Sequence, residues 1–167
     1  MANNTVNKTR KLVFSALFAA LACVATMVIK IPSPLNGYIN LGDSVVLLSG
    51  WLLGPAYGFG AAAVGSALAD LFAGYGVYAP ATFIIKGLVA LVAYGLHKKI
   101  KNHTAGLIIS AIVAEVLMIG GYYVFEGFLY GFVPSLVNIP ANGVQGIAGT
   151  IVGFVLMKIF KKGNIQF

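Results

Sequence analysis

The chain has 167 residues, of which 59% are hydrophobic and 9% are charged. A soluble domain carries about 25% charged residues, so this composition excludes an ordinary water-exposed surface and indicates that lipid surrounds the protein. The formal net charge is +7, but Lys and Arg gather at the ends of apolar runs, which is typical of cytoplasmic membrane-protein loops and argues against a nucleic-acid partner.

Three helices are predicted in the first half of the chain. The first covers about Leu12–Ile29 and is long enough to span as a retained helix, which argues against a cleaved signal peptide. Residues 30–42 are rich in turn formers. A short helix follows at about Ser44–Leu53 with Asp43 as its N-cap, and a third at about Pro55–Phe72. The second and third helices are either two full spans or a re-entrant hairpin.

Three more helices are predicted in the second half, at about Pro80–Leu96, Ala105–Phe125 and Ser135–Phe160, with an aromatic loop at Glu126–Pro134. Basic clusters near residues 8–11, 98–101 and 158–162 all fall on one side of this arrangement, which places both termini in the cytoplasm. We therefore expect an all-α membrane protein, a compact bundle of about six transmembrane helices that forms one unit over residues 1–167. The length leaves no room for an ATP-hydrolysing domain.

Small residues recur at four-residue spacing in several predicted helices, and most of them are expected to pack helices inside the bundle. Ala16 and Ala20 carry a second interpretation, because the first helix is unusually rich in alanine and could present a smooth docking face to another membrane protein.

Two ionisable residues are predicted deep in the membrane. Lys86 lies roughly 10 Å below the outer end of the fourth helix, and Glu115 roughly 15 Å below that of the fifth. Either they form a structural ion pair, or one or both face a cavity and bind a polar ligand. Asp70 and Glu126 lie nearer the helix ends, where capping or solvation is expected.

The last helix opens with three amides, Asn138, Asn142 and Gln145, which share one helical face. They are interpreted as the wall of a ligand site, with amide-mediated helix packing as the alternative. Aromatic residues also gather at the outer ends, where an interfacial belt is the ordinary reading and stacking on a flat ligand the functional one. From the outer loops and ends we include as candidate binding residues Tyr75, Tyr78, Tyr122 and Asn36.

Enzymatic motifs are absent. The sequence has no Walker A, HExxH or GxSxG pattern, and its single cysteine, Cys23, has no metal-site spacing around it. We expect neither catalysis, nor a metal, nor a cofactor.

A resemblance emerges from several blocks: Ser15–Ala20, Ile39–Ser44, Gly50–Pro55, Ala56–Ala62, Ala67–Leu71, Pro80–Leu88 and Asn138–Gln145. With these blocks the chain resembles the substrate-binding S components of energy-coupling factor (ECF) vitamin transporters. The resemblance implies a bacterial plasma-membrane protein that binds a vitamin in an outward-facing pocket, with residues 30–40 as its lid. It also implies that Ala16 and Ala20 contact a transmembrane coupling subunit (EcfT-type), which is joined to two ATPases.

Within that family the chain is most similar to pyridoxine- or hydroxymethylpyrimidine-type members, and riboflavin or another vitamin is the alternative. Thiamine is less expected, because the outer region lacks tryptophan and Trp51 falls near the inner end of its helix. Lys86 would engage a hydroxylated ring edge, Glu115 a protonated ring nitrogen, and the amides the hydroxymethyl groups. A rival from another class is a stand-alone ion-coupled secondary transporter, which would need an ion relay and often shows an internal repeat.

Overall fold

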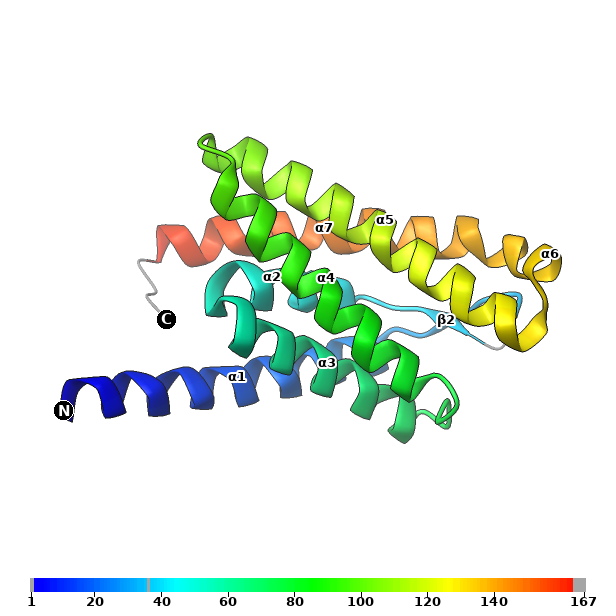
Figure 1. The fold of residues 1–167 in the computed structure, drawn as a ribbon, viewed down its shortest axis with the longest axis horizontal. Helices are drawn as coiled ribbons and strands as arrows, with labels where there is room; N and C mark the ends of the chain where they lie inside the picture. Colours follow the sequence, from blue (N-terminus) through cyan, green and yellow to red (C-terminus); the bar gives the residue numbers. More distant parts are fainter. Residues whose placement is uncertain (1, 36, 164–167) are drawn as a thin grey trace.

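The computed structural model describes residues 2–35 and 37–163, which form a bundle of helices with one short β hairpin (Figure 1). In chain order the elements are α1 (Ala2–Val28), β1 (Ile31–Pro32), β2 (Tyr38–Ile39), α2 (Gly42–Leu53), α3 (Pro55–Phe72), α4 (Ala79–Lys99), α5 (His103–Tyr130), α6 (Phe132–Ser135), a 3₁₀ turn η1 (Leu136–Asn138) and α7 (Ile139–Lys162). The all-α prediction is confirmed for these residues, apart from two strands of two residues each.

Helix α5 is longer than predicted. It continues through Glu126 to Tyr130, so the predicted aromatic loop at Glu126–Pro134 is wrong in its first half, and α6 occupies most of the rest. No proline lies between the start of α5 at His103 and Pro134, and the helix ends only at Gly131, whose φ of 92° suits glycine. Several aromatic side chains therefore lie on a rigid helix rather than on a loop.

The predicted number of full spans is not confirmed. Four helices of the described chain are long and apolar enough to cross a membrane: α1 from Lys8, α4, α5, and the segment Phe132–Lys162 that contains α7. Helix α2 has 12 residues and is thus about 18 Å long, which is too short for a hydrocarbon core of about 30 Å. Gly54, with a φ of 82°, joins α2 to α3 in a tight bend, as the prediction of a short helical pair requires.

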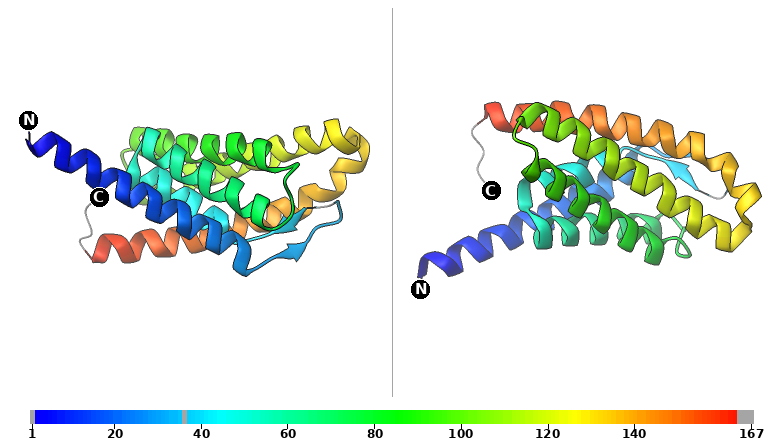
Figure 2. Two further views of the ribbon diagram at one scale, coloured as in Figure 1. Left: turned by 90° about the horizontal axis from the view of Figure 1, so that it is seen from below. Right: turned by 45° about the horizontal axis from the view of Figure 1, so that its top comes forward.

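The two ends of the bundle differ in character (Figures 1 and 2). The start of α1, the α4–α5 turn and the end of α7 lie together at one end, here named the basic end because Lys98, Lys101 and Lys161 are there. The β hairpin, the α3–α4 turn and α6 lie at the opposite end, here named the hairpin end. This arrangement agrees with the sequence-based prediction that the basic clusters share one side.

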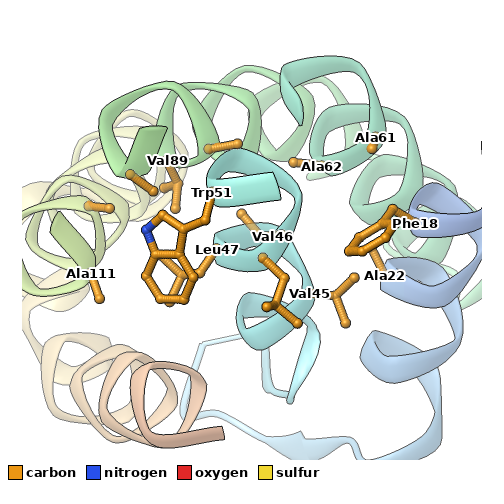
Figure 3. Packing of buried hydrophobic residues seen from close by; sticks show 14 of the residues in the cluster. Phe18, Ala22, Val45, Val46, Leu47, Trp51, Ala61, Ala62, Val89 and Ala111 are labelled. Atoms are coloured by element: carbon orange, nitrogen blue, oxygen red, sulfur yellow. The ribbon is translucent and has the colours of Figure 1, made fainter. Parts of the chain in front are cut away.

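Helix α2 occupies the centre of the bundle, and eleven of its twelve residues are buried. A helix that is apolar on every face is expected to be enclosed by others. Figure 3 shows Trp51 and Leu47 directed toward Ala111 of α5, while Val45 lies toward Ala22 of α1. The indole nitrogen of Trp51 also donates to the Ser110 hydroxyl of α5 at 3.0 Å.

Small residues allow the close helix contacts that surround α2. A Cβ atom added to Gly50 would collide with the α4 backbone at Ala90, and one added to Gly65 would collide with the α1 backbone at Ala19. These positions confirm that small residues at four-residue spacing pack helices inside the bundle.

Candidate functional site

A polar cavity lies at the hairpin end, with about 390 Å³ of space including the solvent at its mouth. Its lining comes from the hairpin, the end of α3, the α3–α4 turn, and helices α4, α5 and α7: Ser33, Gly37, Tyr38, Asn40, Asp70, Tyr75, Tyr78, Thr82, Tyr122, Glu126, Asn142 and Gln145.

The β hairpin covers this cavity and is held there by amides more than 100 positions away in the sequence. The backbone and side-chain nitrogens of Asn40 both donate to Oε1 of Gln145, at 3.0 and 3.1 Å. Leu35 N donates to Oδ1 of Asn138 at 3.2 Å, and Nδ2 of Asn138 donates back to the Leu35 carbonyl at 3.3 Å. Two of the three predicted wall amides therefore anchor the hairpin.

One wall of the cavity combines an aromatic stack with a carboxylate. The Tyr38 hydroxyl donates to Oδ1 of Asp70 at 2.7 Å, and the Tyr38 and Tyr75 rings lie 4.8 Å apart. Burial, reinforced by the negative charge of Asp70, raises the pKa of Tyr38. The phenol therefore stays protonated and acts as a donor to the carboxylate.

A second part of the lining comes from the end of the α3–α4 turn, α4 and α5. Thr82 and Tyr122 share a hydrogen bond of 3.0 Å between their hydroxyls, and the Tyr78 hydroxyl donates to Oε1 of Glu126 at 3.4 Å. Nδ2 of Asn138 donates to the same Glu126 oxygen at 2.8 Å, so Glu126 also links this part of the lining to the hairpin anchor. Both Asp70 and Glu126 are buried, in contrast to the predicted capping or solvation.

Each of these two carboxylates keeps one oxygen without a partner. Oδ2 of Asp70 and Oε2 of Glu126 are buried and accept no hydrogen bond. An unsatisfied buried acceptor is costly, so such an atom inside a polar cavity indicates where a ligand donor would bind. The arrangement suits a ring that carries amino, protonated nitrogen or hydroxyl groups.

An ion pair lies on the inner side of the cavity. Lys86, one helical turn beyond Thr82, pairs with Oδ1 of Asp43, and both side chains are buried. Nε2 of Gln145 donates to Oδ2 of Asp43 at 2.7 Å, so a single amide joins the pair to the cavity. Two interpretations are corrected here. Lys86 does not pair with Glu115, and Asp43 is not a cap, because α2 already begins at Gly42 and makes no side-chain cap bond.

Glu115 lies elsewhere. It is 5% exposed, and neither of its carboxylate oxygens has a hydrogen-bond partner. It packs against Gly146 at the contact between α5 and α7, close enough to Asp43 and Lys86 for their charges to act on it. It is not among the cavity residues but borders an apolar cleft on the outside of the same helix pair.

The candidate binding residues are thus divided. Five of them line the cavity: Tyr75, Tyr78, Tyr122, Asn142 and Gln145. Asn138 binds the hairpin, and Lys86 is linked to the cavity only through Asp43 and Gln145. Glu115 borders the apolar cleft instead of the cavity, and Asn36 lies outside the described residues. That these residues bind a ligand stays a prediction.

Residues that sequence reasoning did not select complete the lining, among them Thr82, Asp70 and Glu126. The two acids carried a usable signal, since ionisable residues inside a membrane mark functional sites by default. For Thr82 the signal was its position one turn before Lys86.

The predicted docking residues Ala16 and Ala20 are both exposed on α1. Figure 2 shows α1 along the outside of the bundle, with its first turns extending past the other helices. Large apolar side chains flank the two alanines, including Leu17 at 57% and Leu21 at 47% exposure. This face of α1 is thus largely exposed in the described structure.

Comparison with known proteins gives a family match over residues 6–162, to the model described as "ECF-type riboflavin transporter, S component". The riboflavin transporter RibU of Staphylococcus aureus is 33% identical over 161 residues, which cover 92% of this chain and 84% of RibU. The thiamine precursor transporter HmpT of Lactococcus lactis is 30% identical over 156 residues, with coverage of 90% and 84%. A solved S component of a bacterial ECF transporter superposes with a TM-score of 0.72 at 28% identity, covering 93% of this chain and 97% of the other.

Proposed function

The chain belongs to the family of S components of ECF-type riboflavin transporters, and from this membership we propose that it captures one small water-soluble vitamin or vitamin precursor in the cavity at the hairpin end. The observation that carries the proposal is a polar cavity lined by two carboxylates that each keep a buried oxygen without a partner. The bound molecule then passes into the cell with the help of an ATP-driven coupling module.

The ligand that fits best is a single-ring compound of the pyridoxine or hydroxymethylpyrimidine type. The 390 Å³ includes the solvent at the mouth, so the enclosed space is smaller still, which favours one substituted ring over the three fused rings and polyol chain of riboflavin. The likeness to HmpT supports the precursor type, whereas the family description and the likeness to RibU support riboflavin as the alternative. Opening of the hairpin would be needed to enlarge the cavity for riboflavin.

In the proposed complex the ring stacks on the tyrosines of the cavity, whose rings already contact one another: Tyr75 lies 4.8 Å from Tyr38 and 6.4 Å from Tyr78, centroid to centroid. Ring amino or protonated nitrogen groups donate to the buried, unpartnered oxygens of Asp70 and Glu126. Hydroxymethyl groups bond to the amides of α7 that line the cavity.

The hairpin is the proposed lid. It is held by four hydrogen bonds to the side-chain amides of Gln145 and Asn138. None of these four bonds is a backbone bond within a helix, so breaking them leaves the helices intact. Gln145 also donates to Asp43, so release of Asn40 from Gln145 would change the environment of the Lys86–Asp43 pair. We assign this ion pair to the positioning of Gln145 rather than to direct contact with the ligand.

The exposed face of α1 around Ala16 and Ala20 is the proposed contact with the transmembrane coupling subunit, which carries two ATPases. Small residues let a partner helix approach closely, and this face is not used inside the bundle. Replacing both alanines by leucine should abolish copurification with a coexpressed coupling module while vitamin binding stays intact. Uptake that needs no coupling module would instead support the secondary-transporter class.

The test of the ligand is calorimetry and native mass spectrometry of the detergent-purified chain with pyridoxine, hydroxymethylpyrimidine, riboflavin, thiamine, pantothenate and folate. One compound should bind one to one. Asp70→Asn should weaken that binding by roughly 10- to 150-fold, the effect of losing a charged hydrogen-bond acceptor. Tyr123→Phe, outside the cavity, is the control.

Tight binding of riboflavin alone would reject the single-ring assignment and keep the S-component function. If a folded protein bound none of the six compounds, the vitamin-capture proposal itself would be refuted. Equal binding by Asp70→Asn and by wild type would refute the assignment of the site to this cavity.

A further inference from the structure

A second polar cavity lies at the basic end of the bundle, far from the site described above. It has about 360 Å³ of space, the adjoining solvent included, and lies between the first turns of α5 and the last turns of α7. Its polar lining is cationic or hydrogen-bond donating, with His103 and Thr104 on α5 and Lys158 and Lys161 on α7. The ammonium group of Lys158 lies 4.4 Å from the centroid of the Phe154 ring, which holds it at the cavity wall.

No acidic side chain of the described residues pairs with these lysines. The chain has four acidic side chains, and all of them lie toward the other end or the centre. Two line the cavity at the hairpin end, one pairs with Lys86, and the last, Glu115, is twelve residues and therefore about 18 Å along α5 from His103. Like charges around one cavity repel, so an anion from outside the chain is the natural occupant.

The remaining lining is apolar and identifies the kind of anion. Leu107, Phe154 and Met157 form the other side of the cavity, which a free inorganic ion would leave unused. Further along the same two helices lies an almost wholly apolar cleft with about 620 Å³ of space, the adjoining solvent included. The α7 positions that line the cleft and those that line the cationic cavity share one face of the helix, because they follow one another at three- and four-residue spacing: 143, 146, 147, 150, 151, 154, 157, 158 and 161.

We propose that this surface binds an anionic phospholipid, with the phosphate on His103, Lys158 and Lys161 and one acyl chain along the groove between α5 and α7. The cationic cavity lies at the helix ends, where a headgroup resides, and the apolar cleft begins about one turn deeper. Ile112, at 53% exposure, and Ile151, at 59%, then contact the acyl chain rather than open lipid.

The test compares retention of phosphatidylglycerol and phosphatidylcholine, with identical acyl chains, by native mass spectrometry of the full chain after delipidation. Phosphatidylglycerol should remain bound one to one where phosphatidylcholine does not. Lys158→Gln/Lys161→Gln should lower its retention by roughly tenfold, from loss of two charges near the headgroup. Lys99→Gln/Lys101→Gln removes two exposed lysines from the same end outside the cavity and should retain the lipid.

A second pair of variants tests the acyl-chain groove. Thr150→Phe narrows the cleft about 12 Å from Lys158 and should lower retention, whereas Gly120→Phe points into open space and should not. If millimolar inorganic phosphate displaced phosphatidylglycerol and Thr150→Phe left its retention unchanged, the cavity would be a phosphate site. That result would overturn the lipid assignment. Equal retention of phosphatidylglycerol and phosphatidylcholine would refute the proposal. Equal loss of phosphatidylglycerol from the two lysine double variants would also refute it, because binding would then depend only on the surface charge of the basic end.

Discussion

The buried ion pair between Lys86 and Asp43 gives the sharpest test of the structure. Asp43→Asn keeps the size of the side chain and removes its charge, which leaves the Lys86 ammonium buried without its counter-ion. Removing one partner of a buried pair costs about 3–5 kcal/mol, because the remaining charge has lost its compensation without regaining water. For a chain of this length that cost corresponds to a fall in the unfolding temperature of roughly 6–20 °C.

The assay is thermal unfolding of the purified protein in one detergent, followed by Trp51 fluorescence or circular dichroism. The matched control is Asp43→Asn/Lys86→Met, which removes both charges and keeps most of the volume. It should recover much of the lost stability, because an uncharged pair carries no desolvation penalty. An Asp43→Asn protein as stable as wild type, or a double variant no more stable than the single one, would refute the reasoning.

Glu115 allows a further check of the same electrostatics. It is one of the further carboxylates on which the charge of Lys86 acts, and neither of its oxygens has a hydrogen-bond partner. Glu115→Gln alone should therefore change stability less than Asp43→Asn does. If Glu115→Gln were the more damaging substitution, the predicted Lys86–Glu115 pair would be restored and the assignment of Asp43 as the partner would be wrong.

Three other predictions concern packing and the lid. Gly65→Ala should destabilise the bundle by about 1–3 kcal/mol in thermal unfolding, because the new methyl group meets the α1 backbone, whereas Gly60→Ala on the same helix should be neutral or stabilising. Trp51→Phe should cost about 1 kcal/mol through loss of the bond to Ser110, and an unchanged unfolding temperature would contradict this. Asn138→Ala should speed hydrogen–deuterium exchange at the Leu35 amide, and exchange at the wild-type rate would show that the hairpin is held by other contacts.

Much of the architecture was predictable because it depends on local composition. Long apolar runs with basic ends predict membrane helices, and α3 begins and ends at the predicted Pro55 and Phe72. The short helix before Gly54 was also expected, since Gly54 and Pro55 end one helix and begin another. The resemblance to S components rested on blocks of residues along the chain, and the family match covers residues 6–162.

The partners of the buried charges were not predictable in the same way. Lys86 and Glu115 lie at similar depth on two consecutive helices. An ion pair between them is expected if consecutive helices bring these two side chains face to face. The structure instead places α2 at the centre of the bundle, so that Asp43 rather than Glu115 meets Lys86. A charge pairs with the nearest opposite charge, and that distance is set by helix packing rather than by depth along a helix.

The sequence by itself determined that lipid surrounds the protein and where most helices lie. It also determined that the basic clusters share one end and that polar residues lie inside the membrane, because each of these features follows from residue type and local spacing. Only the tertiary structure decided what those polar residues do. The hairpin brings Tyr38 to Asp70 and Asn40 to Gln145 across 32 and 105 positions, and Glu126 is buried on a helix that continues past its predicted end. Such contacts depend on how helices turn and cross, which no local pattern of residues specifies.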